Sequence, residues 1–570
     1  MKNDNSPPEA NNQNVLFAPK NKKRYLVASK RGNFALQSGI QPLQSHELKR
    51  FVETIPNANI VKTIKPNTTF SPQSISPNET KEVHVVEMGT DDCASLLSNL
   101  PPHIHVEEEQ TLDYMDSVGV QAQIPARRYS LAKVATQITY EFLVLGEGDI
   151  PLTGVEIQIS SAGTMASGST NSKGMAKLSL KTMPNSHIDT VFAKAKTMYW
   201  DVYVDNPALT KDSVNVIRLS SLAETIPGFP NDFRYGWGQK LMGLADQESR
   251  LTGKGVKIAI IDSGLGTHEL LNHVTRGYNV TGSDDVKVWN VDTIGHGTHV
   301  AGMITANGEN GQLRGFCPEA EIIVVKVFPG GTTSALVEAI KICMEENVDV
   351  ANLSLGTPNV SPIVEQHIEE ASMSGVAMVV AAGNSGGPVQ FPANSANTLA
   401  VSAIGATTEV RENTWDASQV NPELMTTTGI FSPRFTSFGP QVNVSAPGVS
   451  IVSTGPDNTY FPDSGTSMSA PHITGLAGLL LAHHPIFKNE CKARDYNRVR
   501  ALFNMLCETS CPLQFGSERS GFGLPNLQTV APLLIPTPEK TTKSNGASPP
   551  PKMSNSVAQQ GVPPYYYVMQ

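Results

Sequence analysis

The chain has 570 residues, which at about 150 residues per domain leaves room for two to four domains. It contains 43 Lys and Arg and 52 Asp and Glu, so its formal charge is −9, and we expect no binding to nucleic acid or to an anionic membrane surface. Hydrophobic residues make up 39%, but no apolar run reaches the roughly 18 residues of a membrane span. The 46 Gly and 40 Pro exclude a coiled coil and favour an α/β or mixed fold rich in loops.

The two ends of the chain are polar. Residues 1–22 are rich in Asn and Pro, residues 536–570 are rich in Pro, Ser, Thr and Lys, and we expect both segments to be disordered. The start shows no apolar stretch of the kind found in secretory signal peptides. The six cysteines form no CxxC pair, so we expect free thiols in a cytoplasmic protein. The alternative is export by a non-Sec route, with a Cys507–Cys511 or Cys491–Cys507 bridge.

Residues 23–115 have the pattern of a small α/β domain. Short apolar segments alternate with amphipathic ones in a βαββαβ-like order. The expected elements are strands at 24–28, 58–61, 81–88 and 103–106, and helices at 46–54 and 91–100.

Residues 128–222 change to strict alternation of apolar and polar side chains. Segments 139–144, 155–159 and 176–180 show this period of two, and turns rich in Gly, Ser and Asn separate them. Short alternating strands at this spacing predict a β-sandwich.

From residue 230 to about 530 the pattern becomes strand–helix–strand. Continuous apolar strands with helices between them predict a parallel sheet covered on both faces, and hence an α/β fold. We expect strands at 256–261, 322–327, 348–353, 376–382 and 399–403, and helices at 334–347 and 363–374. The stretch 408–433 looks like an insertion that could border a cleft.

Three short motifs in this region carry reactive side chains. Asp262 ends an apolar strand, His296 opens a helix of small residues, and Ser467 precedes a long apolar run. Each residue taken alone could be a turn former or a helix cap. Together they supply a nucleophile, a base that takes its proton, and a carboxylate that orients the base, in one of the known chain orders for such triads.

Asn384 follows another buried strand, in the segment Ala-Ala-Gly-Asn. An amide that donates to a developing oxyanion contributes roughly 3–4 kcal/mol to catalysis. The alternative is that Asn384 belongs to an ordinary turn with no catalytic role. Beside the three reactive residues, Asn384 is a candidate for the side chain that donates to an oxyanion.

These motifs resemble those of the subtilisin-like serine proteases, in the family's order. The matching segments are Asp-Ser-Gly at 262–264, His-Gly-Thr-His-Val-Ala-Gly at 296–302, Ala-Ala-Gly-Asn at 381–384 and Gly-Thr-Ser-Met-Ser-Ala-Pro-His at 465–472. The resemblance implies a seven-stranded parallel sheet and endopeptidase activity on protein or peptide substrates. It assigns the triad to Asp262, His296 and Ser467, the oxyanion side chain to Asn384, and substrate-backbone binding to Ser354, Leu355 and Gly356.

The resemblance continues upstream in two separated pieces. Residues 105–109 resemble the end of the family's inhibitory propeptide, and residues 235–239 resemble the start of its mature enzyme. Aligning the run Val-Glu-Glu at 106–108 with the family's matching run implies a cut between Met115 and Asp116. The alternative is a cut near Arg234. The intervening sandwich would serve substrate capture, partner docking or spacing of the propeptide.

No cofactor is required for this chemistry, and the metal ligands are left open. His296 and His299 are spaced i,i+3 without the Glu of the zinc-protease pattern, so we expect His299 to pack or hydrogen-bond inside its helix. Residues 306–318 resemble a calcium loop of the family, and Gln239 lies where the family often has a ligand. A structural calcium ion is left open: it needs six to eight oxygens, and the Asp that the family often has on the segment after the catalytic Asp is not matched here, where Glu269 is the nearest oxygen.

The leading hypothesis is an autoprocessed zymogen of a serine endopeptidase, with its own propeptide as an intramolecular inhibitor. A peptide ligase or cyclase on the same scaffold is an alternative, because hydrolysis and transpeptidation share the acyl-enzyme. A catalytically silent binding protein is the other alternative, and the intact reactive residues argue against it.

Overall fold

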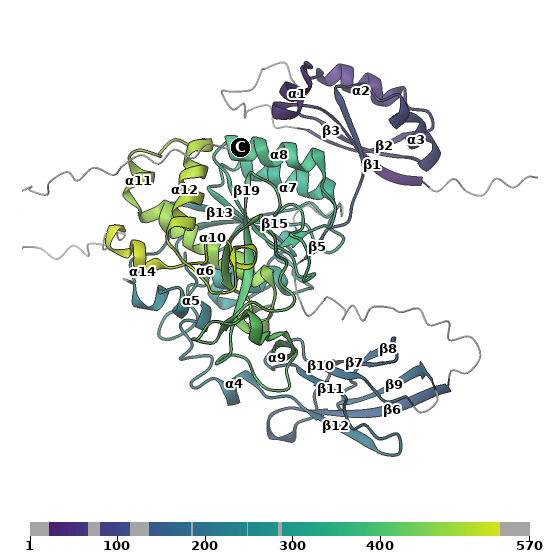
Figure 1. Cartoon of the computed structure of the whole chain (residues 1–570), viewed down its shortest axis with the longest axis vertical. Helices are drawn as coiled ribbons and strands as arrows, with labels where there is room; N and C mark the ends of the chain where they lie inside the picture. The colour runs from purple at the N-terminus through teal and green to yellow at the C-terminus, as the bar shows by residue number, and fades with distance from the viewer. Residues whose placement is uncertain are drawn as a thin grey trace, which may run out of the picture. The chain divides into compact units, whose positions relative to one another are not determined.

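A computed structural model describes residues 22–65, 80–114, 136–183, 186–247, 249–282 and 288–535 (Figure 1). The first part is an antiparallel sheet in the order β2–β3–β1–β4 with short helices. Helix α1 was not expected from the sequence. The elements are β1 (Lys22–Ser29), α1 (Gly32–Ser38), α2 (Ser45–Glu53), β2 (Asn59–Ile64), β3 (Val83–Gly89), α3 (Thr90–Ser98) and β4 (Ile104–Glu108).

The two central strands, β1 and β3, are buried on both faces over most of their length, which explains their apolar character. Tyr25 and Val27 of β1 belong to a core with Leu48 of α2. The alternate residues Leu26 and Ala28 belong to a second core, shared with helices α7 (Thr333–Glu345) and α8 (Pro362–Met373) of the region after residue 230. The sheet is therefore a layer between its own helices and that region.

The middle part consists of two sheets with a shared core. One sheet has the order β11–β10–β7–β8 and the other β12–β6–β9. Inward residues such as Phe142 and Ile157 are fully buried, whereas their strand neighbours face outward, as the alternation predicts. The strands are β6 (Thr136–Leu145), β7 (Glu156–Ser161), β8 (Thr164–Ser169), β9 (Met175–Thr182), β10 (Thr190–Lys194), β11 (Val202–Asp205) and β12 (Val214–Arg218).

The third part is built on an eight-stranded sheet, and this confirms the predicted α/β fold class. The order is β14–β15–β13–β16–β18–β19–β20 with β21 beside β19, and the described pairs run parallel except for β20. The strands are β13 (Lys257–Asp262), β14 (Arg276–Asn279), β15 (Glu321–Lys326), β16 (Val350–Leu353), β18 (Ala377–Ala381), β19 (Thr398–Ala406), β20 (Ile430–Phe431) and β21 (Val442–Pro447).

Helices cover both faces of this sheet (Figure 1). On β13, Ile258 and Ile260 join the core with α10, while Ala259 and Ile261 join the core with α7 and α8. The carboxyl ends of β13, β16 and β18 meet at one edge, where the reactive residues follow. The main helices are α6 (His296–Thr305), α7 (Thr333–Glu345), α8 (Pro362–Met373), α10 (Thr466–His483) and α12 (Tyr496–Glu508).

A hairpin that the sequence analysis missed lies against α6. It consists of β22 (Ile451–Gly455) and β23 (Thr459–Asp463). Further short elements are β5 (Asp113–Tyr114), α4 (Leu222–Thr225), α5 (Trp237–Leu241), β17 (Leu355–Gly356), α9 (Trp415–Gln419), α11 (Pro485–Lys488), β24 (Ser510–Cys511), α13 (Ser517–Ser520), β25 (Leu524–Pro525) and α14 (Leu527–Val530).

A buried ion pair joins the N-terminal sheet to α8. Arg31 Nε lies 2.7 Å from Glu370 Oε1, and the two side chains are 1% and 7% exposed. The Arg31 backbone N–H donates to Gln366 Oε1 at 2.6 Å, and Gln366 Nε2 donates to the Ser29 carbonyl at 3.2 Å. Burial and the Arg31 charge lower the pKa of neighbouring His367 to about 4, so this imidazole is neutral near pH 7.

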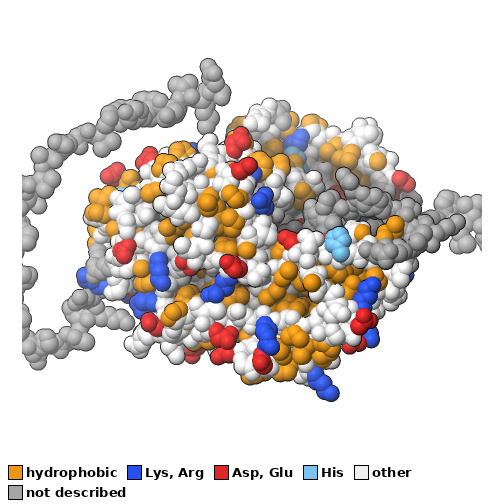
Figure 2. All heavy atoms as spheres, turned by 60° about the horizontal axis from the view of Figure 1, so that its bottom comes forward, with side chains coloured by type: hydrophobic (Ala, Val, Ile, Leu, Met, Phe, Trp, Pro, Cys, Tyr) orange, Lys and Arg blue, Asp and Glu red, His pale blue; other side chains and the backbone are white. Residues whose placement is uncertain are grey.

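The surface carries mixed charge. On the face drawn in Figure 2, basic and acidic side chains are scattered among each other rather than gathered by sign. None of the helices in the described ranges combines the length and apolar character needed to cross a bilayer.

Removal of the Arg31 side chain should loosen the N-terminal sheet. Arg31→Met leaves Glu370 buried without its charge partner, which costs about 3–5 kcal/mol, and amide hydrogen exchange in β1 should accelerate accordingly. The matched control is Lys23→Met, which removes the half-exposed pair with Glu108 and should cost less than about 1 kcal/mol. Equal exchange rates in the two variants would show that the buried pair does not hold the sheet.

Candidate active site

Asp262 and His296 form a buried pair at the carboxyl edge of the parallel sheet. His296 Nδ1 lies 2.7 Å from Asp262 Oδ1, and the Ser263 backbone N–H donates to the same oxygen at 2.7 Å. Asp262 is fully buried and His296 is 2% exposed. A carboxylate in this position holds the proton on Nδ1 and leaves Nε2 as the basic nitrogen.

Asp292 fixes the backbone beside both Asp262 and His296. The sequence analysis did not identify this residue. Its Oδ1 accepts hydrogen bonds from Ser263 Oγ at 2.9 Å and from the Gly295 N–H at 2.8 Å, and its Oδ2 accepts from the Thr298 N–H at 3.0 Å. One carboxylate therefore binds the turn after β13 and the first turn of α6. An acidic residue just before a helix start is the signal that could have identified it.

Ser467 lies at the start of α10 and is fixed by a reciprocal pair of hydrogen bonds. Pro471 has no N–H to donate to the Ser467 carbonyl, as a helix would otherwise require. The Ser354 hydroxyl donates to this carbonyl at 2.9 Å, and Ser467 Oγ donates to the Ser354 carbonyl at 3.1 Å. The start of α10 is thus bound to the end of β16, next to β13 and Asp262.

Asn384 contacts the residue that precedes Ser467. Asn384 Oδ1 accepts from the Thr466 N–H at 2.9 Å and from Thr466 Oγ1 at 2.8 Å, and the Gly383 N–H donates to Thr466 Oγ1 at 3.1 Å. Because Oδ1 is the anchored end of this amide, Nδ2 is the end that can donate to an oxyanion formed beside Ser467.

The chain's own residues 110–114 lie across this site as an added strand. Tyr114 and Asp113 pair antiparallel with Leu355 and Gly356. On the other side Thr111 forms a bridge with Thr332, and the Leu112 N–H donates to the Gly331 carbonyl at 2.9 Å. Such augmentation binds main chain, as a substrate strand would be bound.

Two side chains of this strand are held by the cleft. Leu112 is 4% exposed and lies in the apolar cluster that contains Leu355 and Phe328. The Tyr114 ring lies 5.2 Å from the His296 ring and 5.7 Å from the Phe328 ring, measured between centroids. Tyr114 therefore helps to bury His296. It was absent from the predicted site because an N-terminal residue gives no local sign of such a contact.

Acidic residues just upstream face the starts of two helices. Glu107 accepts hydrogen bonds from the Ile363 N–H at 3.3 Å and from Ser361 Oγ at the start of α8, and Glu109 accepts from Ser334 Oγ of α7. The positive helix ends favour these carboxylates. Burial nevertheless raises the pKa of Glu107 to about 7, although the two hydrogen bonds to it act in the opposite direction.

The predicted residues are placed as follows. Asp262, His296, Ser467 and Asn384 all lie at the edge formed by β13, β16 and β18. Leu355 and Gly356 pair with Tyr114 and Asp113 of the strand at 110–114. The Ser354 side chain instead donates to the Ser467 carbonyl at the start of α10. Met115, the expected residue before the cut, lies outside the described residues.

His299 forms structural hydrogen bonds in this region. Its Nε2 lies 3.0 Å from the Ile451 carbonyl and 3.2 Å from the Phe461 carbonyl, so it fixes α6 to the β22–β23 hairpin. Burial lowers the pKa of His299 to about 3, and the imidazole is neutral. No group of three or more His, Cys, Asp or Glu in the described ranges is arranged to hold a metal ion.

The polar groups of Gln239 and Arg314, beside and in the calcium-like loop 306–318, already have partners within the protein. Gln239 Oε1 accepts from the Gly236 N–H at 3.0 Å, and Gln239 Nε2 donates to the Arg314 carbonyl at 2.8 Å. The buried Arg314 guanidinium donates to the carbonyls of Ser249 and Leu251 at 2.9 and 3.1 Å. Gln239 is therefore already hydrogen-bonded to backbone at both ends of its amide, and the loop residue Arg314 supplies a cation in place of an oxygen ligand, so these two residues do not fit a calcium site.

Comparison with known proteins agrees with this geometry. The model of the Subtilase family matches residues 253–512. Subtilisin Savinase from Lederbergia lenta is 36% identical over 258 residues, which are 44% of this chain and 86% of that protein. The major intracellular serine protease of Bacillus subtilis (strain 168) is 31% identical over 284 residues, 48% of this chain and 81% of that protein.

M-protease from Shouchella clausii (strain KSM-K16) is 34% identical over 277 residues, 48% of this chain. The match spans 64% of that relative's length. The matched region contains all four residues at the sheet edge, on an α/β fold with a parallel sheet. The chain therefore belongs to the subtilase family.

Proposed function

We propose that this chain is a serine endopeptidase synthesised as an autoprocessed zymogen. The observation that carries the proposal is the strand 110–114, which pairs with Leu355 and Gly356 and places Tyr114 against His296. A cleft that accepts extended backbone beside a Ser, a His and a buried carboxylate is suited to peptide-bond cleavage. The substrates would be proteins or peptides, and we propose a cytoplasmic location, which the six free thiols support.

The chemistry assigns one role to each residue. Ser467 Oγ exchanges its hydrogen bond to the Ser354 carbonyl for one to His296 Nε2, and attacks the scissile carbonyl as His296 takes the proton. Asp262 stabilises the imidazolium, and Asn384 Nδ2 donates to the oxyanion. His296 then protonates the leaving amine. Water attacks the acyl-enzyme by the same route and releases the acid.

The register of the bound strand supports a first cut after Met115. Tyr114 occupies the position against His296, Asp113 pairs with Gly356, and Leu112 is buried in the apolar cluster. Met115 follows Tyr114 in the sequence, and we propose it as the residue before the cut. A cut there leaves the sandwich on the processed enzyme and releases residues 1–115 as an inhibitory domain.

Replacement of the reactive residues should abolish peptide hydrolysis without unfolding the chain. Ser467→Ala and His296→Ala should each lower kcat/KM at least about 10⁴-fold, and Asn384→Ala should lower kcat about 10²–10³-fold with KM little changed. The control is Ser517→Ala on the exposed start of α13. Mass spectrometry of the products separates hydrolysis from ligation. Wild-type rates in Ser467→Ala would overturn the proposal.

Metal removal should have little effect. Because the loop residue Arg314 supplies a cation and Gln239 is already hydrogen-bonded to backbone, EDTA should lower the Tm by less than about 2 °C and leave peptidase activity intact. Differential scanning calorimetry with and without EDTA measures this. A large loss of Tm or activity in EDTA that added Ca²⁺ restores and Mg²⁺ does not would show that the protein holds a structural calcium ion.

Processing should depend on Leu112. Edman sequencing of the processed wild type should begin Asp-Ser-Val-Gly, and Ser467→Ala should stay full length. Leu112→Asp buries an unpaired carboxylate and should slow processing at least about 10-fold, while Asp113→Asn, at an exposed position, should not. A product that begins near Tyr235 would contradict this register.

A further inference from the structure

A buried ion pair crosses from the sandwich to the strand that leads to Ser467. Lys194, the last residue of β10, places Nζ 3.1 Å from Oδ1 of Asp463, the last residue of β23. The Asp463 side chain is 3% exposed and that of Lys194 is 24% exposed. Ser467 follows Asp463 by four residues. The sandwich thus supplies the cation for a buried carboxylate next to the nucleophile.

Two more carboxylates lie near the Lys194–Asp463 pair, one on the sandwich and one on the peptidase domain. We call the place where these four residues meet the junction. Asp201 of the sandwich accepts the Trp415 N–H at 2.7 Å, and Asp416 of the peptidase domain accepts from Ser450 Oγ at 2.5 Å. Burial, and then the charge of Asp416, raise the pKa of Asp201 to about 7, while Lys194 lowers it. Burial likewise raises the pKa of Asp416, and hydrogen bonds from Ser450 and Ser464 and the Lys194 charge oppose this.

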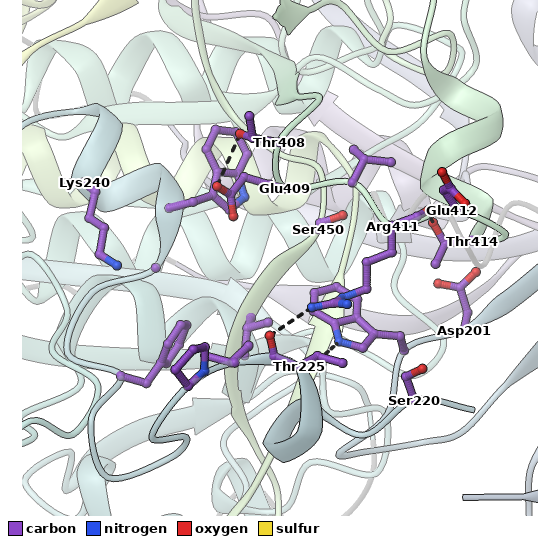
Figure 3. A pocket seen from close by; sticks show the side chains of 18 of the residues that line it. Asp201, Ser220, Thr225, Lys240, Thr408, Glu409, Arg411, Glu412, Thr414 and Ser450 are labelled. Atoms are coloured by element: carbon purple, nitrogen blue, oxygen red, sulfur yellow. Dashed lines mark hydrogen bonds between the residues drawn. The ribbon is translucent and has the colours of Figure 1, made fainter. Parts of the chain in front are cut away.

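The junction encloses very little space. Its cavity has a volume of about 10 Å³, enough for one water, and is lined by Lys194, Tyr199, Asp201, Asp416, Pro462, Asp463 and Ser464. A larger cavity of about 800 Å³ lies beside it, and Figure 3 shows Asp201 next to Thr414 at the edge of that cavity. There Arg411 reaches the Thr225 carbonyl at 3.1 Å and lies over the Trp200 ring. The stretch 408–433 therefore contacts the sandwich.

From Asp463 a short path leads to the reactive serine. Ser464 Oγ accepts the Ser450 N–H at 2.8 Å, and the Gly465 N–H donates to the Gly448 carbonyl at 2.8 Å. The next residue is Thr466, which binds Asn384. Every residue between the ion pair and Ser467 is thus fixed by a hydrogen bond.

The backbone of the sandwich segment also holds this hairpin. The Met198 N–H donates to the Tyr460 carbonyl of β23 at 2.7 Å. The same hairpin supplies the two carbonyls that anchor His299 on α6. Ile451 of the hairpin also packs against Met468 of α10, so the hairpin contacts both the helix that begins with His296 and the helix that carries Ser467.

We propose that the sandwich is a positioning element of the peptidase, and that Lys194 is a positioning residue for Ser467. The proposal rests on the proposed function. Without Lys194, Asp463 is a buried charge with its cation removed, so β23 must shift or admit water to stabilise it. Because Ser467 is separated from Asp463 by only three hydrogen-bonded residues, such a shift moves the nucleophile relative to His296 and Asn384. A misplacement of about 1 Å can cost about 10²-fold in rate.

The test uses three variants of the processed enzyme: one that removes the Lys194 charge, one that keeps it, and one that removes the charges of both Lys194 and Asp463. Lys194→Met should lower kcat for a short peptide at least about 10-fold with KM within about 2-fold, because the peptide-binding strands are unchanged. Lys194→Arg should stay within about 3-fold of wild type, and Lys194→Met with Asp463→Asn should recover most of the loss. The control is Lys177→Met, which removes the exposed pair of Lys177 with Glu141 in the same sandwich and should change neither constant.

Amide hydrogen exchange gives a readout that does not depend on catalysis. Exchange at residues 464–466 should accelerate in Lys194→Met and return toward the wild-type rate in the double variant. Wild-type exchange and kcat in Lys194→Met would overturn the proposal. So would a loss confined to KM for protein substrates, which would make the sandwich a substrate-capture domain.

If Lys194→Met does not fold, the double variant with Asp463→Asn decides the question. A folded double variant with wild-type exchange but low kcat overturns the proposal, and a folded double variant with recovered kcat supports it. A wild-type chain without peptidase activity refutes the proposed function instead, and the exchange result still decides this proposal.

Discussion

The fully buried carboxylate of Asp262 is the charge on which the arrangement of the site depends. A buried charge is tolerable only if donors bind it, and here the Ser263 N–H and His296 Nδ1 both meet Asp262 Oδ1 at 2.7 Å. This requirement fixes the turn after β13 against the start of α6. Asp292 accepts hydrogen bonds from both segments, from Ser263 Oγ and from the Gly295 N–H. The imidazole orientation that general-base chemistry needs is thus also the arrangement that stabilises the buried charge.

Buried polar groups also need partners at the start of α10 and where the other two parts of the chain meet this region. Pro471 removes a helical donor, and the Ser354 hydroxyl replaces it, which fixes Ser467. Arg31 neutralises Glu370 where the N-terminal sheet meets α8, and Lys194 does the same for Asp463 where the sandwich meets β23. Two separate parts of the chain therefore contribute cations to the subtilase-family region. One of these contacts is released with the N-terminal domain in the proposed processing, and the other is kept.

Much of the fold could be read from the sequence because the strands are either continuous apolar runs or strictly alternating ones. The segments 256–261 and 376–382 became β13 and β18, because a strand covered on both faces needs apolar residues throughout. The reactive residues could be named because they follow such strands or open helices. Tyr114 could not be found this way, because its role depends on a contact with His296, far away in the sequence. Asp292 and the β22–β23 hairpin do have local signals, an acidic residue before a helix start and a Gly-Pro-Asp-Asn turn between two short strands, but the analysis of apolar periodicity did not use them.

The central claim is that Ser467 is the nucleophile of a peptidase whose base is His296. The most direct measurement is reaction of the processed enzyme with a fluorophosphonate, followed by mapping of the modified residue by tandem mass spectrometry. The account predicts one adduct per chain, on Ser467, which forms with the wild type and does not form when His296 is replaced by Ala. An adduct on another serine, or unchanged labelling of Ser467 without His296, would contradict it.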